Sequence, residues 1–310
     1  MSQFEVPIAF LVFNRPDTTA RVFEEIRRIK PLKLLVVADG PRADRPGEAE
    51  KCAAVRSIVE QVDWACEVLK NYAETNMGCK RRVSSGLDWV FEQVEEAIIL
   101  EDDCLPDRSF FSYCESLLDH YRYDERIMHI GGANFQCGIV RGDGSYYYSH
   151  LNHIWGWATW RRAWKYYDVN MSSYPFFCKQ HHMDNILPHK GMRRAWLRSF
   201  STVFANQLDT WDYQWTYAIW QQNGLSIIPN VNLVTNIGFG SDATHTSDSD
   251  NPFAATPASS HGDIVHPRFM VPDRVADEYT FRVITRITPR RLLAKYRKQV
   301  ISRLCGPNHG

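Results

Sequence analysis

Residues 97–103 read AIILEDD, four apolar residues followed by three consecutive carboxylates. A short, continuous apolar run is typical of a strand that is buried on both faces of a parallel sheet. Three adjacent carboxylates repel one another, and this crowding is costly unless a cation or hydrogen-bond donors neutralise it. The stretch therefore predicts a buried strand that carries Glu101, Asp102 and Asp103 at its end as a candidate cation site. The alternative is a solvated acidic turn in which Asp103 caps the next helix.

The residues before this strand alternate in the same way between apolar runs and amphipathic segments. We predict earlier strands at residues 6–13 (VPIAFLVF), 33–38 (KLLVVA) and, more weakly, 67–69. Helices are predicted between these strands and after the acidic triplet, at about residues 17–29, 48–61 and 80–94 and from Pro106 onward. Such alternation indicates an α/β fold with a mostly parallel central sheet flanked by helices.

The pattern changes after about residue 125. Short strands are predicted at 127–130, 146–149, 225–228 and 232–235, and helices at about 160–166, 192–206 and 213–222. An aromatic-rich loop is expected at 153–161, and residues 241–260, rich in small and polar side chains, predict a mobile loop. We therefore expect one domain at 1–265, with a nucleotide-binding half (1–125) and an acceptor-binding half (126–265) that is helical and aromatic.

The tail, residues 266–310, differs from the rest of the chain because its end is a basic amphipathic segment. Leu292, Leu293, Tyr296 and Val300 fall on one helical face, among six Lys and Arg side chains from Arg290 to Arg303. Such a helix fits either the anionic inner face of a membrane, as a peripheral contact, or a terminal helix packed on the domain.

Composition excludes several broad classes of protein. The 310 residues contain 36 basic and 36 acidic side chains, which argues against a general nucleic-acid-binding protein. Hydrophobic residues make up 44% of the chain, enough for a substantial core. The eight cysteines form no C-x-x-C pair, and neither a secretory signal nor a membrane-spanning stretch is recognisable. We expect reduced cysteines and a cytoplasmic location.

Polar residues also follow the first two predicted strands. In parallel sheets, ligands bind outside the carboxyl ends of the strands, so these residues are expected to meet the acidic triplet in one crevice. Asn14 and Arg15 follow the first strand, and Arg15 has the chemistry to pair with either a phosphate or a surface carboxylate. Asp39 follows the second strand and suits a base or ribose hydroxyl, or a plain Asp-Gly turn. Arg82 belongs to a basic helix start, which favours an anionic partner or a solvated basic face.

Three residues in the second half are further candidates. Trp157, in the segment Trp155-Gly156-Trp157, has a ring that suits sugar stacking or core packing. Asp212 fits either a helix cap or a general base. His245 lies in the polar loop and would reach a metal or a phosphate only if that loop folds over the site.

Together these segments resemble the nucleotide-sugar glycosyltransferases of the GT-A fold. The resemblance is to the N-acetylglucosaminyltransferase I type and to bacterial family 2 enzymes that are often labelled hemolytic-protein-like. It covers about residues 5–245 and is most specific at the acidic triplet, which is followed by Pro106 and Phe110-Phe111. The other matching segments are 7–15, 36–40, the helix from Gly78, 156–160 and 211–215.

The resemblance implies an inverting enzyme of polysaccharide biosynthesis that uses Mn²⁺ or Mg²⁺. The donor would be a UDP-sugar such as UDP-GlcNAc or a related hexose, and the acceptor a hydroxyl of a glycan or of a lipid-linked saccharide. Asp212 would be the base, although the segment reads WDYQW where relatives carry paired aspartates.

The remaining roles divide between the metal and the donor. Asp103 would bind the metal, and His245 is a second candidate ligand if its loop folds over the site. Donor binding would fall to Asn14, Arg15, Asp39, Arg82, Glu101, Asp102 and Trp157.

Two other functions are compatible with the sequence. A nucleotidyltransferase acting on a sugar phosphate would also use a parallel sheet, carboxylates and Mg²⁺. It would normally carry a Gly-rich basic loop after the first strand, where this chain has Asn14-Arg15-Pro16. A non-catalytic carbohydrate-binding protein on a degenerate transferase fold is the third hypothesis.

Overall fold

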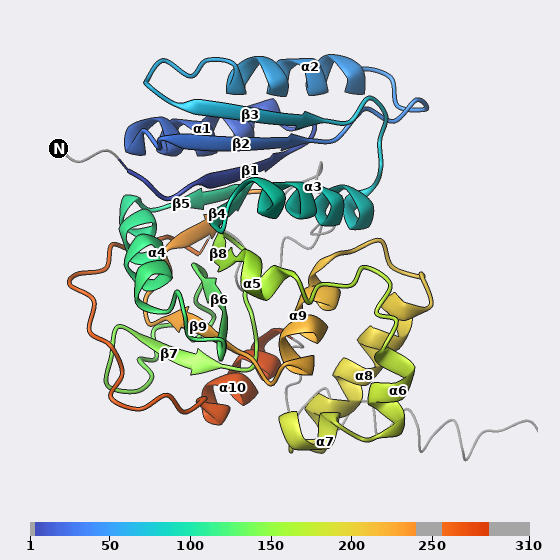
Figure 1. The fold of residues 1–310 in the computed structure, drawn as a ribbon, viewed down its shortest axis with the longest axis vertical. Helices are drawn as coiled ribbons and strands as arrows, with labels where there is room; N and C mark the ends of the chain where they lie inside the picture. The colour runs from blue at the N-terminus through green and yellow to red at the C-terminus, as the bar shows by residue number, and fades with distance from the viewer. Residues whose placement is uncertain (1–3, 240–255, 285–310) are drawn as a thin grey trace, which may run out of the picture.

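The computed structural model describes residues 4–239 and 256–284. Its centre is an eight-stranded sheet with the strand order β3-β2-β1-β4-β8-β6-β9-β7, drawn as the stack of arrows in Figure 1. A small antiparallel pair, β10-β5, lies beside it. His245 and residues 285–310 of the predicted tail lie outside the described residues.

The N-terminal half forms the predicted parallel α/β unit. Its strands are β1 (Ile8–Val12), β2 (Lys33–Ala38), β3 (Glu67–Tyr72) and β4 (Glu96–Glu101), and every neighbouring pair among them is parallel. The helices between them are α1 (Pro16–Ile29), α2 (Glu48–Val59) and α3 (Cys79–Gln93). All five residues of β1 are buried, whereas β3 at the edge is partly exposed, which explains its weaker apolar pattern.

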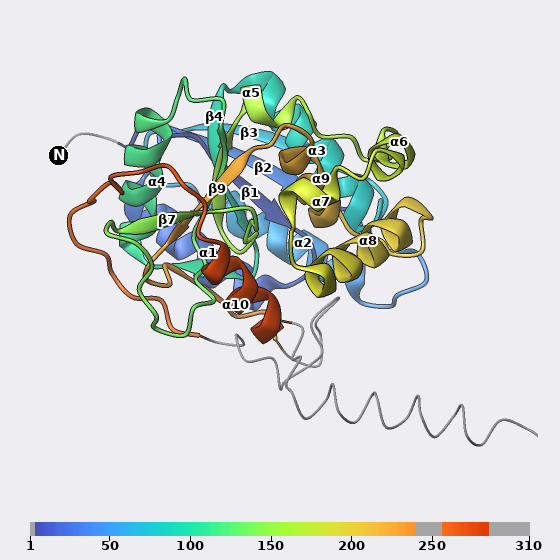
Figure 2. The ribbon, with the colours of Figure 1, turned by 90° about the horizontal axis from the view of Figure 1, so that it is seen from below.

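The rest of the chain continues the same sheet with mixed strand directions, through β6 (Ile127–Gly131), β7 (Tyr146–Ser149), β8 (Trp157–Trp160) and β9 (Leu225–Pro229). The separate antiparallel pair consists of β5 (Cys104–Pro106) and β10 (Val234–Asn236). The helices of this part of the chain are α4 (Arg108–His120), α5 (Arg161–Trp164), α6 (Tyr174–Lys179), α7 (Met183–Ile186), α8 (Lys190–Phe204), α9 (Asp212–Gln221) and α10 (Arg274–Ile284). Figure 2 shows α6, α7 and α8 grouped on the side of the molecule opposite α4 and β7.

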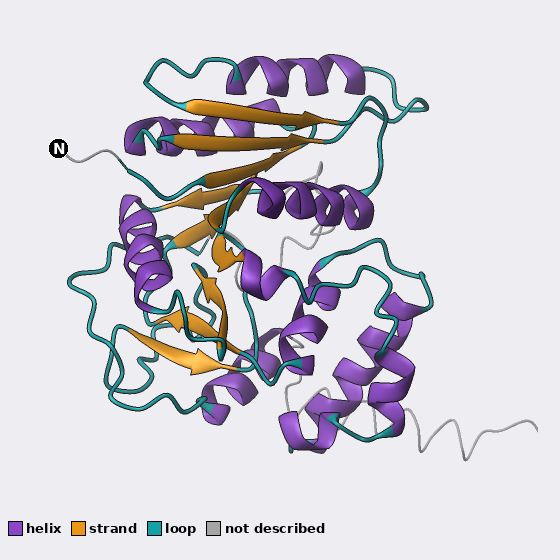
Figure 3. Ribbon diagram, in the orientation of Figure 1, coloured by secondary structure: helices purple, strands orange, loops and turns teal. Residues whose placement is uncertain are grey.

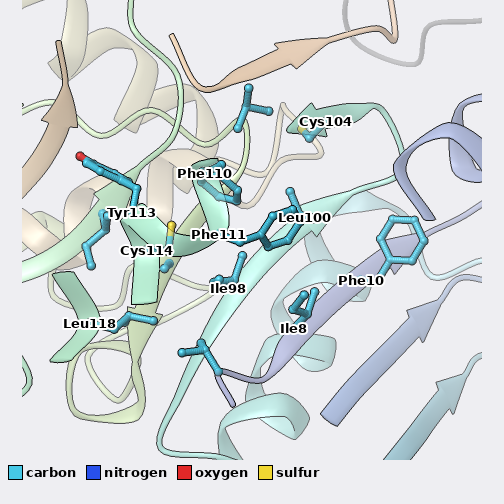
Figure 4. Packing of buried hydrophobic residues seen from close by; sticks show 14 of the residues in the cluster. Ile8, Phe10, Ile98, Leu100, Cys104, Phe110, Phe111, Tyr113, Cys114 and Leu118 are labelled. Carbon is cyan, nitrogen blue, oxygen red and sulfur yellow. The ribbon is translucent and has the colours of Figure 1, made fainter. Parts of the chain in front are cut away.

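Helices cover both faces of the sheet, as the coloured elements of Figure 3 show. On one face, α1, α2 and α4 pack against alternate residues of the strands, among them Ile8 and Phe10 of β1. Figure 4 shows this layer, in which Phe110 and Phe111 of α4 lie against the strands. On the other face, α3, α8 and α9 pack against the intervening residues, such as Ala9 of β1. The predicted fold class, a mostly parallel central sheet flanked by helices, is confirmed.

One part of the second half differs from the prediction. The aromatic segment is not wholly a loop, because residues 157–160 form β8 between β4 and β6. Residues 266–284 of the predicted tail pack on the domain: Phe281 of α10 belongs to the core, and Asp277 accepts a hydrogen bond from Ser149 of β7. In the described ranges, no helix is both long and apolar enough to cross a membrane.

Candidate functional site

A cleft of about 680 Å³ opens at the carboxyl ends of β1, β2 and β4. A volume of this size is typical of a pocket for a small-molecule ligand. The second half supplies the opposite wall, with residues from the segment before β8, from the start of α9 and from α10. Seven predicted site residues reach this cleft together with Asp212: Asn14, Arg15, Asp39, Arg82, Glu101, Asp102 and Asp103.

The acidic triplet lies at the end of β4, as the sequence predicted. Arg15 Nη1 donates to Asp103 Oδ2 at 2.8 Å, and the two side chains are only 17% and 15% exposed. The backbone N–H of Phe13 donates to Asp102 Oδ2 at 3.0 Å. Arg15 and the end of β1 therefore hold two of the three carboxylates in place.

The carboxyl groups of the triplet resist ionisation. Burial raises the pKa of Glu101 well above its usual value, with further contributions from Asp103, Asp102 and Asp212. Burial and then the neighbouring Asp103 raise the pKa of Asp102 to about 7. A cation placed among these groups would lower both pKa values, since it stabilises the charged carboxylates.

Asp39 is buried at the end of β2 and is held by three donors. Its Oδ1 accepts from the backbone N–H groups of Gly40 at 2.8 Å and Met77 at 2.9 Å, and its Oδ2 accepts from Asn76 Nδ2 at 2.9 Å. Burial raises the pKa of Asp39, and these hydrogen bonds oppose the rise. The carboxylate is thereby fixed in orientation where it lines the cleft.

Arg82 lines the cleft from α3, but its guanidinium also has a structural task. Nε donates to the carbonyl of Ala38 at 3.2 Å, and Nη2 donates to the backbone and side-chain oxygens of Asn71 at 2.5 and 2.8 Å. Arg82 thus ties together the ends of β2 and β3. On the other side of the cleft, Asn14 donates to Glu48 Oε1 at 2.9 Å, and Glu48 pairs with Arg42.

Asp212 is the first residue of α9 and faces the same cleft. It does not cap the helix, because the N-cap is Trp211 and no side chain makes a capping hydrogen bond there. The Thr210 hydroxyl donates to Asp212 Oδ1. Asp212 is close enough to Glu101 to contribute to the raised pKa of that residue.

The structure does not bring Trp157 to the cleft. The side chain is 0% exposed and stacks between His129, at 5.1 Å, and Trp211, at 5.6 Å. The interpretation that Trp157 lines a sugar pocket is therefore wrong in this conformation, because β8 turns the ring into the core. Trp155, two residues earlier, lines the cleft instead.

Several cleft residues were not predicted from the sequence. Asp209 accepts hydrogen bonds from the backbone N–H groups of Cys79 and Lys80, both at 3.0 Å, and so caps α3 from a distant part of the chain. His153, Trp196 and Phe281 also line the cleft. Of these residues, only His153 lies in a segment whose aromatic pattern drew attention in the sequence. The places of Asp209, Trp196 and Phe281 in the cleft depend on tertiary contacts, which the sequence pattern does not show.

The donor atoms of the cleft fit a hard divalent cation. Within residues 4–239 and 256–284, no three His, Cys, Asp or Glu side chains converge to hold a metal by themselves. Mg²⁺ at a nucleotide site usually takes only one or two protein carboxylates, with phosphate oxygens and water in the other positions, and Mn²⁺ favours the same oxygen ligands. Asp103 with a second carboxylate of the triplet would supply that set.

Comparison with known proteins finds similarity at the level of solved structures alone. No protein-family profile and no curated protein matches the chain. The mannosyltransferase PcManGT from Pyrobaculum calidifontis, in complex with GDP-Man and Mn²⁺, is 13% identical over 70% of this chain and 69% of its own, with a TM-score of 0.42.

Two further similar structures are nucleotide-related enzymes. A UDP-glucose pyrophosphorylase complexed with UDP-glucose is 10% identical over 52% of this chain and 78% of its own, at a TM-score of 0.33. The 4-diphosphocytidyl-2C-methyl-D-erythritol synthase from Anaerococcus prevotii is 9% identical over 56% of this chain and 77% of its own, with a TM-score of 0.32. Identities and TM-scores this low transfer no activity to this chain.

Proposed function

We propose that this chain is a metal-dependent, inverting glycosyltransferase that moves a sugar from a UDP-sugar to a hydroxyl of a glycan or lipid-linked saccharide. The charge of the cleft carries the proposal. Among the described residues that line it, six carry carboxyl groups and three are arginines, so the acidic side chains outnumber the basic ones. The carboxylates are Asp39, Glu101, Asp102, Asp103, Asp209 and Asp212, and the arginines are Arg15, Arg42 and Arg82. Such a site repels a diphosphate unless a cation binds with it.

The nucleotide would bind at the carboxyl ends of β1 and β2. A carboxylate offers about four lone-pair positions. Three protein donors already occupy Asp39. The backbone N–H of Gly78 also lowers the pKa of Asp39, so the imide N–H of uracil would share the carboxylate with these protein donors. Arg15, which holds Asp103, would contact the diphosphate as well.

Asp103, with Glu101 or Asp102, would hold the cation. When bound, the cation would offset the negative charge that develops on the leaving diphosphate. Asp212 would accept the proton of the acceptor hydroxyl while the acceptor oxygen bonds to the anomeric carbon of the sugar. The bond from that carbon to the diphosphate breaks, and the diphosphate leaves with the electron pair. One proton therefore ends on Asp212, and the anomeric configuration inverts.

The variant Asp212→Asn tests this assignment. It keeps the shape of the side chain and removes its basicity, so sugar transfer should fall about 10²- to 10⁴-fold while UDP-sugar affinity stays unchanged. The measurement is UDP release from UDP-sugars in the presence of saccharide acceptors, with Asp119→Asn on the exposed face of α4 as the control. Unchanged transfer in Asp212→Asn would remove it as the base. Pyrophosphate release from UTP and a sugar 1-phosphate would instead establish a nucleotidyltransferase.

A further inference from the structure

The exposed apolar side chains of the molecule are concentrated in one region. Of the fourteen large hydrophobic residues that are exposed in the described parts of the chain, seven belong to residues 139–140 and 265–284. These seven are Ile139, Val140, Val265, Phe269, Val271, Val275 and Ile284. Apolar side chains that gather on the surface of a protein mark sites of contact with a partner or a membrane.

Residues 265–275 run along β7, the edge strand of the sheet. Ser145, just before β7, donates its backbone N–H to the carbonyl of Val265 at 2.7 Å, and Pro272 forms a bridge with Tyr148 of β7. In Figure 2 this orange segment passes β7 and continues into α10. We refer to its four exposed apolar side chains as the 265–275 surface: Val265, Phe269, Val271 and Val275.

Phe269 and Val271 share one face of this segment. Both line a shallow hollow of about 290 Å³ beside the tyrosines of β7. Even so, the side chains of Phe269 and Val271 are 70% and 68% exposed, because the segment lies on the outside of the sheet edge. The hollow does not bury them, and an external partner would.

The chain that follows this surface is strongly basic. Glu278 is the last acidic residue in the sequence, and eight basic residues come after it. They are Arg282, Arg286, Arg290, Arg291, Lys295, Arg297, Lys298 and Arg303. The described structure ends at Ile284, the last residue of the helix whose first turn carries Val275. The basic sequence therefore starts on the same helix that begins at the 265–275 surface.

Charges within the surface itself are balanced. Arg268 and Arg274 are exposed among the apolar side chains, and Asp143 and Asp273 offset them nearby. The surface thus contributes apolar area, and the sequence after Glu278 contributes the positive charge. A peripheral protein binds a bilayer stably when two such signals act together, apolar insertion and attraction of basic residues to anionic lipid.

Helix α10 connects this surface to the cleft. Val275 lies in its first turn, whereas Phe281 and Ile284 near its other end line the cleft. At 1.5 Å per residue, Val275 and Ile284 are about 14 Å apart along the helix. Asp277 holds the helix in place, because its side chain accepts a hydrogen bond from Ser149 of β7. A flat partner on the surface would therefore lie close to one wall of the cleft.

We propose that the 265–275 surface docks on an anionic lipid bilayer. Phe269, Val271 and Val275 enter the headgroup region, and the basic sequence after Glu278 contacts the lipid phosphates. The inference goes beyond the proposed function, and the docking does not require it. If that function also holds, the acceptor is a lipid-linked saccharide that the bilayer presents beside the cleft.

Sedimentation of the full chain with vesicles tests the docking. The wild type should sediment with vesicles of equal parts phosphatidylcholine and phosphatidylglycerol, and much less with phosphatidylcholine alone. The double variant Phe269→Ser/Val271→Ser should bind the mixed vesicles about tenfold more weakly or worse, with an unchanged melting temperature because both side chains are exposed. Phe176→Ser on α6 is the control, since Phe176 is 65% exposed but lies away from β7, and it should bind as the wild type does (Figure 2).

Two results would overturn the inference: no binding of the wild type to the mixed vesicles, or equal binding by the double variant. A wild-type dimer in sedimentation velocity that the double variant loses, without vesicle binding, would assign the surface to a second copy of the chain instead. Neither Phe269 nor Val271 lines the cleft, so binding of UDP with Mn²⁺ is an independent readout. If UDP does not bind while the vesicles retain the wild type and release the double variant, the proposed function fails and the docking surface stands.

Discussion

Charged side chains and a neutral histidine both line the cleft. Glu101, Asp102 and Asp103 gather with Arg15 where the parallel strands end. His153 lies in the aromatic wall, where burial keeps its ring neutral.

The neutral state of His153 has a measurable consequence for stability. Its pKa is about 4 in the folded chain and about 6.5 when unfolded, so below pH 6.5 the unfolded chain binds a proton that the folded chain does not. The wild type should therefore lose roughly 1–2 kcal/mol more than His153→Asn between pH 7 and pH 5. Urea unfolding at both pH values checks this. An equal loss in the two proteins would mean that His153 is not buried as a neutral ring.

The positions of single residues were predictable where they follow from the rule that ligands bind at the carboxyl ends of parallel strands. Arg15, Asp39 and the triplet follow parallel strands, so their meeting in one crevice was predictable. Trp157 was not, because a local pattern does not tell which way a ring points. Asp209 was missed because its hydrogen bonds to α3 join residues 130 and 129 positions apart.

Among the elements, α3 connects the sheet to the cleft. It begins after Gly78, whose φ of 79° favours glycine, and its first amides bind Asp209. Gly86, in the middle of the helix, faces β2: a Cβ there would lie 2.4 Å from a methyl carbon of Val37. The helix therefore packs unusually close to the sheet.

Gly86→Ala tests that close packing. The added methyl group should force α3 away from β2 and cost about 1–3 kcal/mol, even though alanine favours helices. Gly262→Ala is the control, because nothing lies within 4 Å of its added Cβ. The check is the midpoint of urea unfolding, and equal midpoints for the two variants would contradict the packing described here.

Asp209→Ala tests the long-range cap of α3. Loss of the two hydrogen bonds should cost about 0.5–2 kcal/mol and speed hydrogen exchange at the amides of Cys79 and Lys80. Asp107→Ala removes a local cap, on α4, and should lower stability without affecting those amides. Exchange of Cys79 and Lys80 at the wild-type rate in Asp209→Ala would show that the cap is not formed in solution.

The sequence predicted most elements but not β8. Four parallel strands and their helices were recognisable because apolar runs alternate with amphipathic segments. The four residues of β8 are all buried between β4 and β6, so they show no polar alternation, and Gly156 before them suggested a loop. A strand this short and fully buried looks like any other apolar segment.

For the molecule as a whole, the cleft lies between the two halves of the chain. Strand ends of the first half provide the carboxylates and Arg15, and the second half provides Asp212, the aromatic wall and α10. Contacts cross the predicted boundary at residue 265, because α10 packs on distant residues such as Gln136, which donates to Thr280 at 2.7 Å. The local composition of a segment does not predict contacts with residues that are far away in the sequence.

The cation-dependent binding of UDP tests the central claim most directly. Calorimetry should show that UDP binds the wild type with Mn²⁺ and much more weakly without it. Asp103→Asn should lose about tenfold or more of the Mn²⁺-dependent affinity, because it removes the charged ligand of the cation. Asp119→Asn should bind as the wild type does. If UDP binds equally well with and without Mn²⁺, or if Asp103→Asn retains the full affinity, the cleft is not the nucleotide and metal site proposed for it.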